Sequence, residues 1–295
     1  MDKKGKRRVA TIGTFDGLHR GHKRVLSQLK ATAARMGLEP MVICFDRHPL
    51  ETIAPHRAPL FIQCPSERTN QLYREGLSIL TLEFTPQIAA LTAREWMERM
   101  HSEYGVDALI VGYDNTFGRD GVNFSLADYK QLGREVGVEI IEASYEPHAA
   151  SSAIRRLVKE GEIPEANALL GDYFTIIGRV VAGKHLGASL GYPTANVEPS
   201  YRAQMPKTGV YAVEVMIEGE IAWRKAVANV GRQPSVSPDE PERLEVHIPG
   251  FAGNLYGQRL SVRFLRHLRD EMKFPSLEEL KAQIAADIDS LTTKP

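Results

Sequence analysis

The chain has 295 residues, of which 43% are hydrophobic, and its 37 Lys and Arg residues balance its 37 Asp and Glu residues. This length is enough for two ordinary domains, and the balanced charge argues against a global field that would recruit nucleic acid or a membrane surface. Two cysteines, Cys44 and Cys64, are too few for a disulfide scaffold and suit a reducing compartment. We expect a cytoplasmic protein without a signal peptide or membrane span, which binds anionic small molecules through local groups.

Strand-like and helical patterns alternate in the first half of the chain. The strand-like runs are rich in β-branched residues and cover residues 9–15, 41–45, 77–84, 108–112 and 138–143. The helical stretches between them carry start signals, such as Thr92 followed by Glu95, and stop signals, such as Gly37. Five strands with intervening helices predict a parallel, doubly wound, Rossmann-like α/β sheet, whose ligand binds outside the carboxyl ends of the strands.

The first strand meets the first helix at the glycine-rich stretch GTFDGLHRGH, residues 13–22. Free N–H groups and the dipole at such a helix start form a site for an anion, and glycines let a phosphate approach the main chain. His19 and His22 lie three residues apart on one face of the first helical turn, so we expect them to point at the same ligand. Glycine-rich turns occur in every α/β protein, and the two imidazoles are therefore the more telling feature.

Polar clusters follow three of the predicted strands. They comprise Asp16 with the two histidines, residues 45–49, and residues 112–119. Each cluster could be an ordinary turn, because Asp, Asn, Gly and Pro are common in turns. Their common position at the carboxyl edge of the predicted sheet favours a binding site there.

The pattern changes near residue 172, where we place the domain boundary: residues 1–171 form the first domain and residues 172–295 the second. Residues 152–170 are helical, with Ser152 as a candidate cap and Gly171 as the stop. After them come strand-like runs without intervening helices, at residues 174–181, 209–217, 222–228, 243–248 and 258–265. This pattern predicts an all-β Greek-key-type barrel.

A C-terminal helix is predicted from Ser276 to about Leu291, with Glu279 completing a capping box. We expect it to pack on the barrel through Leu277, Leu280, Ile284 and Ile288.

Residues 178–196 are unusual for a barrel, because they combine several glycines with Pro193-Thr194-Ala195-Asn196. Such a loop can fold over phosphates, and the oxygens of Thr194 and Asn196 are hard ligands that suit Mg²⁺. The alternative is that the glycines mark hairpins and that Thr-Ala-Asn is a turn. Glu245 has an apolar residue on each side in a predicted strand, so it is either a functional carboxylate or a solvent-facing one.

The motifs of the first half resemble those of known enzymes. His-x-Gly-His after a buried strand resembles the nucleotidyltransferase superfamily, and residues 13–22 are more narrowly similar to bacterial flavin adenylyltransferases. Phe45-x-x-His48-Pro49, residues 112–118 and residues 151–155 resemble further motifs of that family. The resemblance implies an ATP site at Gly13, Phe15, His19, His22, Asp114, Ser151, Ser152 and Arg155, a flavin site at Phe45, His48 and Pro49, and catalytic roles for His19, His22 and Arg155.

The second half resembles riboflavin kinase over nearly its whole length. The similarity lies in residues 178–196 and in the motifs at 209–211, 229–231, 244–247, 255–257 and 268–274. It implies that Glu245 is the base for the ribityl 5′-hydroxyl and that Thr194 and Asn196 hold Mg²⁺-ATP. It further implies ATP contacts at Gly183 and Gly191, and flavin contacts at Glu245, Arg269 and Phe274.

Together the two halves resemble bifunctional prokaryotic riboflavin kinase/FAD synthetase, with ATP, riboflavin, FMN and FAD as substrates and products and Mg²⁺ as cofactor. The sequence departs from the family patterns at three places: Asn115-Thr116 replaces Phe-Arg, Ala188 replaces Arg, and a segment with Gln233 and Ser235 replaces Arg-Pro-Thr. One alternative is therefore an adenylyltransferase with an inactive kinase-like barrel. Another is a non-catalytic flavin sensor. Oligomeric state is not indicated by the sequence.

Overall fold

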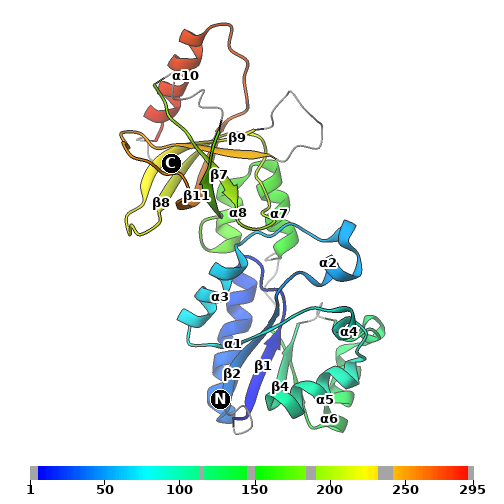
Figure 1. Cartoon of the computed structure of the whole chain (residues 1–295). Helices are drawn as coiled ribbons and strands as arrows, with labels where there is room; N and C mark the ends of the chain where they lie inside the picture. The colour runs from blue at the N-terminus through cyan, green and yellow to red at the C-terminus, as the bar shows by residue number, and fades with distance from the viewer. Residues whose placement is uncertain (1–5, 113–115, 145–149, 184–190, 232–241, 292–295) are drawn as a thin grey trace. The chain divides into compact units, whose positions relative to one another are not determined.

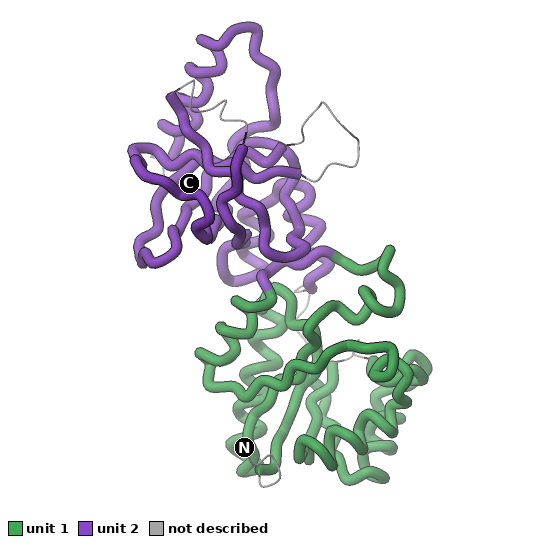
Figure 2. The backbone as a smooth tube through the Cα atoms, in the orientation of Figure 1, with its two compact units in different colours: residues 1–59, 65–149 green, residues 60–64, 150–295 purple. Residues whose placement is uncertain are grey.

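The computed structural model describes residues 6–112, 116–144, 150–183, 191–231 and 242–291. The chain divides into two compact units, coloured separately in Figure 2. Unit 1 comprises residues 1–59 and 65–149, and unit 2 comprises residues 60–64 and 150–295. None of the helices within the described ranges is both long enough and apolar enough to cross a membrane.

Unit 1 contains the predicted parallel sheet (Figure 1). Its strands are β1 Arg8–Ile12, β2 Glu39–Phe45, β3 Ser78–Leu82, β4 Val106–Val111 and β5 Glu139–Glu142, in the order β3-β2-β1-β4-β5. The order reverses at β1, which pairs with β2 on one side and β4 on the other. Ligands of doubly wound sheets bind at such a switch point, outside the carboxyl ends of the strands.

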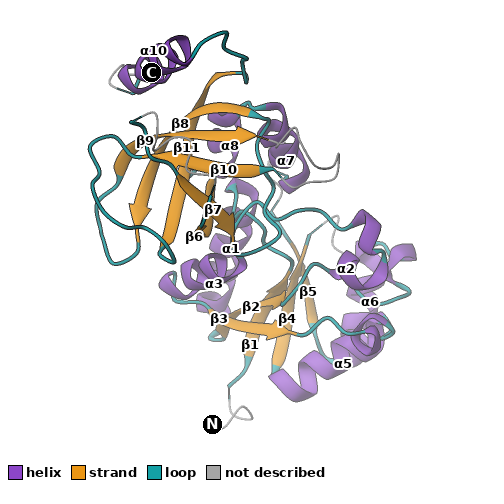
Figure 3. Cartoon of the chain, turned by 45° about the horizontal axis from the view of Figure 1, so that its top comes forward, coloured by secondary structure: helices purple, strands orange, loops and turns teal. Residues whose placement is uncertain are grey.

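Helices cover both faces of this sheet (Figure 3). They are α1 Arg20–Met36, α2 Pro49–Ile53, α3 Pro65–Arg74, α4 Pro86–Ala89, α5 Ala93–Tyr104 and α6 Leu126–Val136, with short 3₁₀ turns at Pro55–Arg57 and Gly121–Asn123. Alternate residues of β1 face opposite sides. Val9 packs in the cluster formed with α1 and α3, and Ala10 packs in the cluster formed with α5 and α6.

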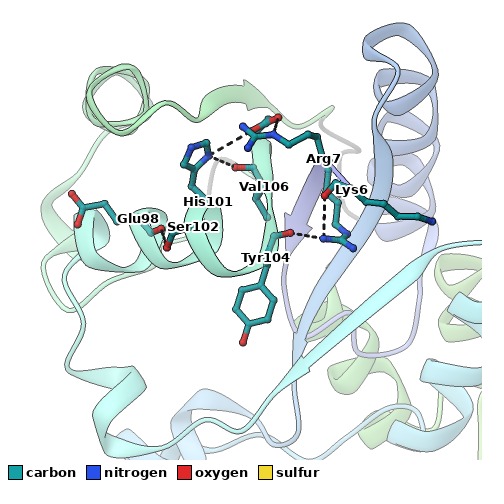
Figure 4. Close-up of polar contacts among 9 residues, drawn as sticks. Lys6, Arg7, Glu98, His101, Ser102, Tyr104 and Val106 are labelled. Carbon is teal, nitrogen blue, oxygen red and sulfur yellow. Dashed lines mark hydrogen bonds and ion pairs between the residues drawn. The ribbon is translucent and has the colours of Figure 1, made fainter. Parts of the chain in front are cut away.

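The amino edge of the sheet is closed by polar contacts between the chain entering β1 and the α5–β4 connection (Figure 4). Arg8 Nη1 donates to the Tyr104 carbonyl oxygen at 2.6 Å, and Arg7 forms an ion pair with Asp107. His101 Nδ1 lies 3.0 Å from the Val106 carbonyl oxygen. These contacts tie strand starts to a helix end, so their role is structural.

Unit 2 is a closed barrel of six antiparallel strands. They are β6 Thr175–Val181, β7 Ala195–Pro199, β8 Gly209–Ile217, β9 Arg224–Gly231, β10 Arg243–His247 and β11 Arg259–Arg269, in the order β10-β7-β6-β11-β8-β9. Strands β8, β9 and β10 are consecutive neighbours, and β11 returns beside β8, which is a Greek-key arrangement. The largest core side chains, Tyr211, Phe174 and Phe264, are fully buried.

Strand β7 departs from the sequence prediction, which treated residues 193–196 as part of a loop. Ala195 and Val197 are buried, and β7 pairs with both β6 and β10. Pro, Thr and Asn favour turns locally, but pairing on both sides overrides that preference.

Two helices, α7 Ser151–Glu160 and α8 Ile163–Leu170, belong to the barrel unit. Their apolar residues join the barrel core: Ile154, Val158, Ile163, Ala166 and Leu170. Asn167 connects α8 to the barrel, since its Nδ2 donates to the Phe264 carbonyl oxygen at 2.9 Å. Residues 150–171 therefore group with the barrel, although the sequence analysis assigned them to the first domain. Ser152 is not the cap of α7, because Ala150 occupies that position without a side-chain hydrogen bond.

A short segment from the first half, residues 60–64, also belongs to unit 2. The Phe61 N–H donates to the Arg202 carbonyl oxygen, and the Gln204 N–H donates to the Phe61 carbonyl oxygen, both at 2.8 Å. Ile62 is buried in the barrel core cluster.

Helix α10 Leu277–Asp289 begins where the sequence predicted, with the Ser276 hydroxyl accepting from the Glu279 N–H at 3.2 Å. The expected apolar packing is wrong for Leu277, which is 61% exposed. The only buried residue of α10 is Asp287, so a polar contact anchors this helix.

Candidate functional sites

The glycine-rich turn after β1 has an unusual backbone. Phe15 and Leu18 have φ values of 49° and 41°, and Gly17 has a φ of 86°. Positive φ is uncommon for residues with bulky side chains. Both apolar side chains are nonetheless buried, at 3% and 2% exposed, in the cluster beneath α1. The core therefore holds this turn in a strained shape, which is typical of ligand-binding segments.

His19 and His22 lie together at the start of α1, as predicted. His19 caps the helix, with Nδ1 accepting from the His22 N–H at 3.4 Å. The two imidazole rings stack with centroids 3.7 Å apart and an interplanar angle of 19°. Since His19 is only 4% exposed, its ring is preorganised. This pair at a helix N-terminus can donate to a phosphate group.

The first turn of α1 has basic residues where helices normally have acidic ones. It contains no Asp or Glu, whereas Arg20, Lys23 and Arg24 lie in or next to it. Cations near the positive end of the helix dipole are unfavourable unless an anion is present. Arg20, Lys23 and Arg24 are not among the predicted site residues, and the absence of acids in this turn is the signal that could have identified them.

The second predicted cluster lies after β2. Phe45 is buried and packs edge-to-face on Phe84, with centroids 4.8 Å apart. His48 caps α2, since its Nδ1 accepts from the Leu50 N–H at 3.1 Å, and Pro49 is the first residue of the helix. The capping role of His48 and the position of Pro49 in α2 are structural, and their predicted contact with flavin stays a prediction.

Asp46 links this cluster to the segment after β3. Its Oδ1 accepts from the Phe84 N–H at 2.9 Å, and its Oδ2 lies 2.9 Å from Arg47 Nη2. Burial acts to raise the pKa of Asp46, but the hydrogen bonds from Arg47 and Phe84 outweigh it and hold the pKa below its ordinary value. Asp46 is therefore ionised near neutral pH and closes the connection between two strand ends.

The third cluster is described only in part. Asp114 lies outside the described residues, as do Asn115, Ala188, Gln233 and Ser235. Phe117 is buried, and its N–H donates to the Tyr129 hydroxyl oxygen at 3.1 Å. The same hydroxyl donates to the Phe117 carbonyl oxygen at 3.0 Å. Arg119 is exposed.

The predicted motif at residues 151–155 lies on α7, in unit 2. Ser151 is the first residue of that helix, and Arg155 follows one turn later. Arg155 Nε donates to the Leu60 carbonyl oxygen at 2.7 Å, within the same unit. The predicted role of Ser151, Ser152 and Arg155 with ATP stays a prediction, because the other predicted contacts belong to unit 1.

In the barrel, Glu245 lies in a polar row that crosses three strands. On β10 it is directly opposite Asn196 of β7 and Asn229 of β9. Leu244 and Val246, its neighbours, are both 1% exposed and face the core, so Glu245 lies on the outer face, where it is half-buried. It is therefore neither a core residue nor a fully solvated one. Asn229 had been noted only as part of a motif.

The side chain of Asn196 closely approaches Gly183. A Cβ atom at Gly183 would lie 2.0 Å from Asn196 Nδ2. Gly191 has a φ of 89°, which favours glycine. The two glycines named in the sequence analysis thus have physical reasons in this structure, one steric and one conformational.

A cavity of about 210 Å³ lies on the inner side of this part of the barrel, where its lining includes the core-facing Ala195 and Val246. Its lining combines apolar side chains with Thr194 and Asn254, and includes Val180, Val246, Ile248, Phe251 and Tyr256. His247 supports its rim, with Nδ1 2.8 Å from the Pro193 carbonyl oxygen. An apolar pocket with a few polar groups suits a flat heterocycle.

The possible magnesium ligands in the barrel, Thr194 and Asn196, suit an Mg²⁺ ion that is also bound by the phosphates of a nucleotide. Within the described ranges, no group of three His, Cys, Asp or Glu side chains could hold a metal. Thr194 and Asn196 instead offer two neutral oxygens, two residues apart, at the start of β7. Mg²⁺ commonly keeps several waters and takes further ligands from substrate phosphates, so two protein oxygens are sufficient.

Arg269, a predicted flavin contact, is held by another side chain. Its Nε lies 3.1 Å from both carboxylate oxygens of Asp287, and its Nη2 lies 2.8 Å from Oδ2. Its guanidinium carbon lies 5.7 Å from the ring centroid of Phe274, the other predicted contact. The two are therefore neighbours, and α10 fixes the arginine.

A second network fixes the start of the loop at residues 268–274. Asp270 Oδ1 lies 2.7 Å from Lys207 Nζ and 3.3 Å from His267 Nε2. The hydrogen bond from Lys207 lowers the pKa of Asp270, and burial lowers the pKa of His267. The ring of His267 packs edge-to-face on Tyr211 at 5.1 Å.

Unit 1 thus combines a nucleotidyltransferase-type sheet with paired imidazoles at a helix start, and unit 2 combines a barrel with a Glu–Asn row on its outer face and a separate, mainly apolar cavity. These features define a two-part phosphate-transfer enzyme. Family models agree: one described as FAD synthetase matches residues 1–153, and one described as riboflavin kinase matches residues 170–294.

Individual proteins match over nearly the whole chain. The bifunctional riboflavin kinase/FMN adenylyltransferase of Pseudomonas fluorescens is 38% identical over 285 residues, covering 95% of this chain and 90% of that protein. The protein of the same name from Escherichia coli (strain K12) is 38% identical over 287 residues, with the same coverage. A crystal structure described as a macrolide-efflux protein from Streptococcus pneumoniae aligns with a TM-score of 0.87 and 32% identity, over 99% of this chain and 96% of that one. The chain belongs to the family of bifunctional riboflavin kinases/FMN adenylyltransferases.

Proposed function

We propose that this chain converts riboflavin to FAD in two ATP-dependent steps. Residues 172–295 phosphorylate riboflavin to FMN, and residues 1–171 transfer AMP from ATP to FMN and release pyrophosphate. The observation that supports this best is that each unit has its own polar set suited to phosphate: stacked imidazoles at a helix start in one, and a Glu–Asn row in the other. The two sets also suit different attacking groups.

In adenylyl transfer, an FMN phosphate oxygen attacks the α-phosphorus of ATP. The new P–O bond forms as the bond to the bridging oxygen of pyrophosphate breaks. Because the attacking oxygen is already anionic, no strong base is needed, and the enzyme must align two polyanions and stabilise the leaving group. We assign this to His19, His22 and Arg155, whose N–H groups donate. ATP contacts are proposed at Gly13, Phe15, Asp114, Ser151 and Ser152, and flavin contacts at Phe45, His48 and Pro49.

In the kinase step, the attacking group is a neutral ribityl 5′-hydroxyl, which gains from a base. We assign the base to Glu245, which takes the hydroxyl proton as the oxygen attacks the γ-phosphorus and ADP leaves. Thr194 and Asn196 would hold Mg²⁺, which neutralises charge on the ATP phosphates when bound. Gly183 and Gly191 keep the main chain close to the nucleotide, and Arg269 and Phe274 contact the flavin.

The decisive experiment supplies the purified chain with Mg²⁺, ATP and either riboflavin or FMN, and separates the flavins by chromatography. We expect FMN and then FAD from riboflavin, and FAD from FMN. FAD from FMN without FMN from riboflavin would mean that the barrel is an inactive kinase. Flavin binding without ATP consumption in either assay would mean a sensor and would overturn both assignments.

We also propose that the enzyme works in the cytoplasm, on small-molecule partners. Cys44 and Cys64 are both free and buried, which suits a reducing compartment. Fractionation of cells that express the full chain, with FAD synthesis as the readout, tests this location.

A further inference from the structure

A buried arginine lies beneath the glycine-rich turn of unit 1. Arg68, on α3, is 3% exposed, and with Leu72 it is one of the two buried residues of that helix. Leu72 lies one turn later and packs in the cluster that also contains Phe15 and Leu18. Arginine is almost never fully buried unless it is paired. Its position therefore needs a specific explanation.

The guanidinium of Arg68 bridges the ends of two neighbouring strands. Nη1 donates to the Thr14 carbonyl oxygen at 2.6 Å, and Nη2 lies 3.5 Å from the Phe45 carbonyl oxygen. Thr14 follows β1 and Phe45 is the last residue of β2, and these strands pair in parallel. One side chain thus joins two carboxyl ends at the edge where both predicted motifs lie.

Among the described residues, Arg68 has no acid in direct contact, although the buried Asp16 lies in the turn that it holds. Across the described ranges it forms an ion pair with no carboxylate, and its buried Nε has no hydrogen-bond partner. A buried charge without a counter-charge is costly, because it has lost its hydration. An anion bound at the same edge would offset part of this cost. The stacked imidazoles at the same edge mark where that anion binds.

The arginine also acts on the strained part of the turn. Thr14 directly precedes Phe15, whose φ is 49°. A backbone in this region persists only when its surroundings hold it. The short bond from Nη1 holds the residue before the strained one, while the buried ring of Phe15 holds the residue itself.

We propose that Arg68 is a positioning residue for adenylyl transfer. It fixes the Thr14–Leu18 turn against the end of β2, at the edge where the phosphate groups of ATP and pyrophosphate would add negative charge near the guanidinium. This inference rests on the proposed adenylyltransferase function, but it concerns a residue outside every motif discussed above.

The test compares Arg68→Met, Arg68→Lys and the control Arg74→Met, a change at the exposed end of the same helix. FAD synthesis from FMN and its reversal by pyrophosphate are measured, with riboflavin phosphorylation in the same sample as a check on folding. Removing the bridge misplaces the turn, so Arg68→Met should lose roughly 10²-fold in kcat/KM for adenylyl transfer. Its KM for pyrophosphate should rise, while riboflavin phosphorylation and the control variant stay at the wild-type level.

Arg68→Lys separates charge from geometry, because it keeps the cation but lacks the planar fork whose Nη1 and Nη2 reach the two carbonyls. We expect a KM for pyrophosphate near that of the wild type and a kcat lowered about tenfold. Wild-type kinetics in Arg68→Met would overturn the proposal. If that variant fails to fold, an unchanged kcat in Arg68→Lys overturns it instead. A wild-type chain that makes no FAD from FMN would refute the proposed function, which is a separate result.

Discussion

The ion pair between Arg269 and Asp287 is expected to decide whether α10 stays on the barrel. The side chains are only 17% and 6% exposed, and three contacts of 2.8 to 3.1 Å join them. Gln283 adds a hydrogen bond to Asp287 Oδ1 at 2.9 Å. The apolar side chains of the helix are at most half-buried. Polar contacts therefore make a large contribution to the docking of α10.

Replacing Asp287 by Asn keeps the size of the side chain but removes the charge. Breaking a buried pair costs about 3–5 kcal/mol, because one charge is left without its partner. The Asn oxygen still accepts one hydrogen bond, and Arg269 retains some exposure, so we expect about 2–3 kcal/mol. At 1.4 kcal/mol per factor of ten, this corresponds to a roughly 30- to 140-fold larger population of detached helix.

Hydrogen exchange measures this opening directly. Amides of α10 in Asp287→Asn should exchange faster by that factor, while amides of the barrel core strands stay protected. Glu278→Gln, an exposed change in the first turn of the same helix, is the matched control and should exchange like the wild type. Wild-type exchange of α10 in Asp287→Asn would refute the claim that this pair anchors the helix.

Three further predictions concern activity and pH. Glu245→Gln should lower riboflavin phosphorylation by about 10²–10⁴-fold and leave FAD synthesis from FMN intact, and a wild-type kinase rate would remove Glu245 from the mechanism. Arg155→Ala should lower kcat for adenylyl transfer far more than it raises the KM for ATP; loss of binding with unchanged turnover would contradict its role with the transition state. Burial holds the pKa of His267 below its ordinary value of 6.5, despite the opposing charge of Asp270, so the folded chain binds fewer protons there than the unfolded chain. The stability that this group contributes is complete above pH 6.5 and is lost as the pH falls through the lower folded pKa. The urea midpoint of the wild type should therefore fall between pH 7 and pH 5, and that of His267→Gln should fall less. An equal fall of the two midpoints would contradict the assignment.

Local patterns predicted most of the architecture because most of it is locally encoded. The alternating strands and the helix caps of unit 1 follow from side-chain periodicity and from single residues. Thr92 forms the predicted capping box with Glu95, and Gly37 ends α1 in a left-handed conformation. The stacking of His19 on His22 also follows from their spacing on one helical turn.

The features that sequence reasoning missed depend on partners distant in the chain. The sequence around β7 contains residues that are common in turns. The segment is nonetheless a strand, because it pairs with β6 on one side and β10 on the other. Residues 60–64 join unit 2 through hydrogen bonds to residues 202–204. Arginine usually lies on the surface, and the sequence around Arg68 does not indicate that this one is buried against two strand ends. Residue type predicts only the environment that such residues have on average. It therefore does not predict the burial of a single residue that departs from that average.

The two units distribute charge according to the group that attacks phosphorus. In unit 1 the attacker is an anion, and the described residues around the turn offer imidazoles, a basic first helical turn and a buried arginine. In unit 2 the attacker is an alcohol, and a carboxylate is useful. Glu245 is accordingly flanked by the neutral amides of Asn196 and Asn229, which can orient it without neutralising it as a cation would. Exchanging these electrostatic settings would impair both reactions, which gives a physical reason for one chain to carry two separate phosphate sites.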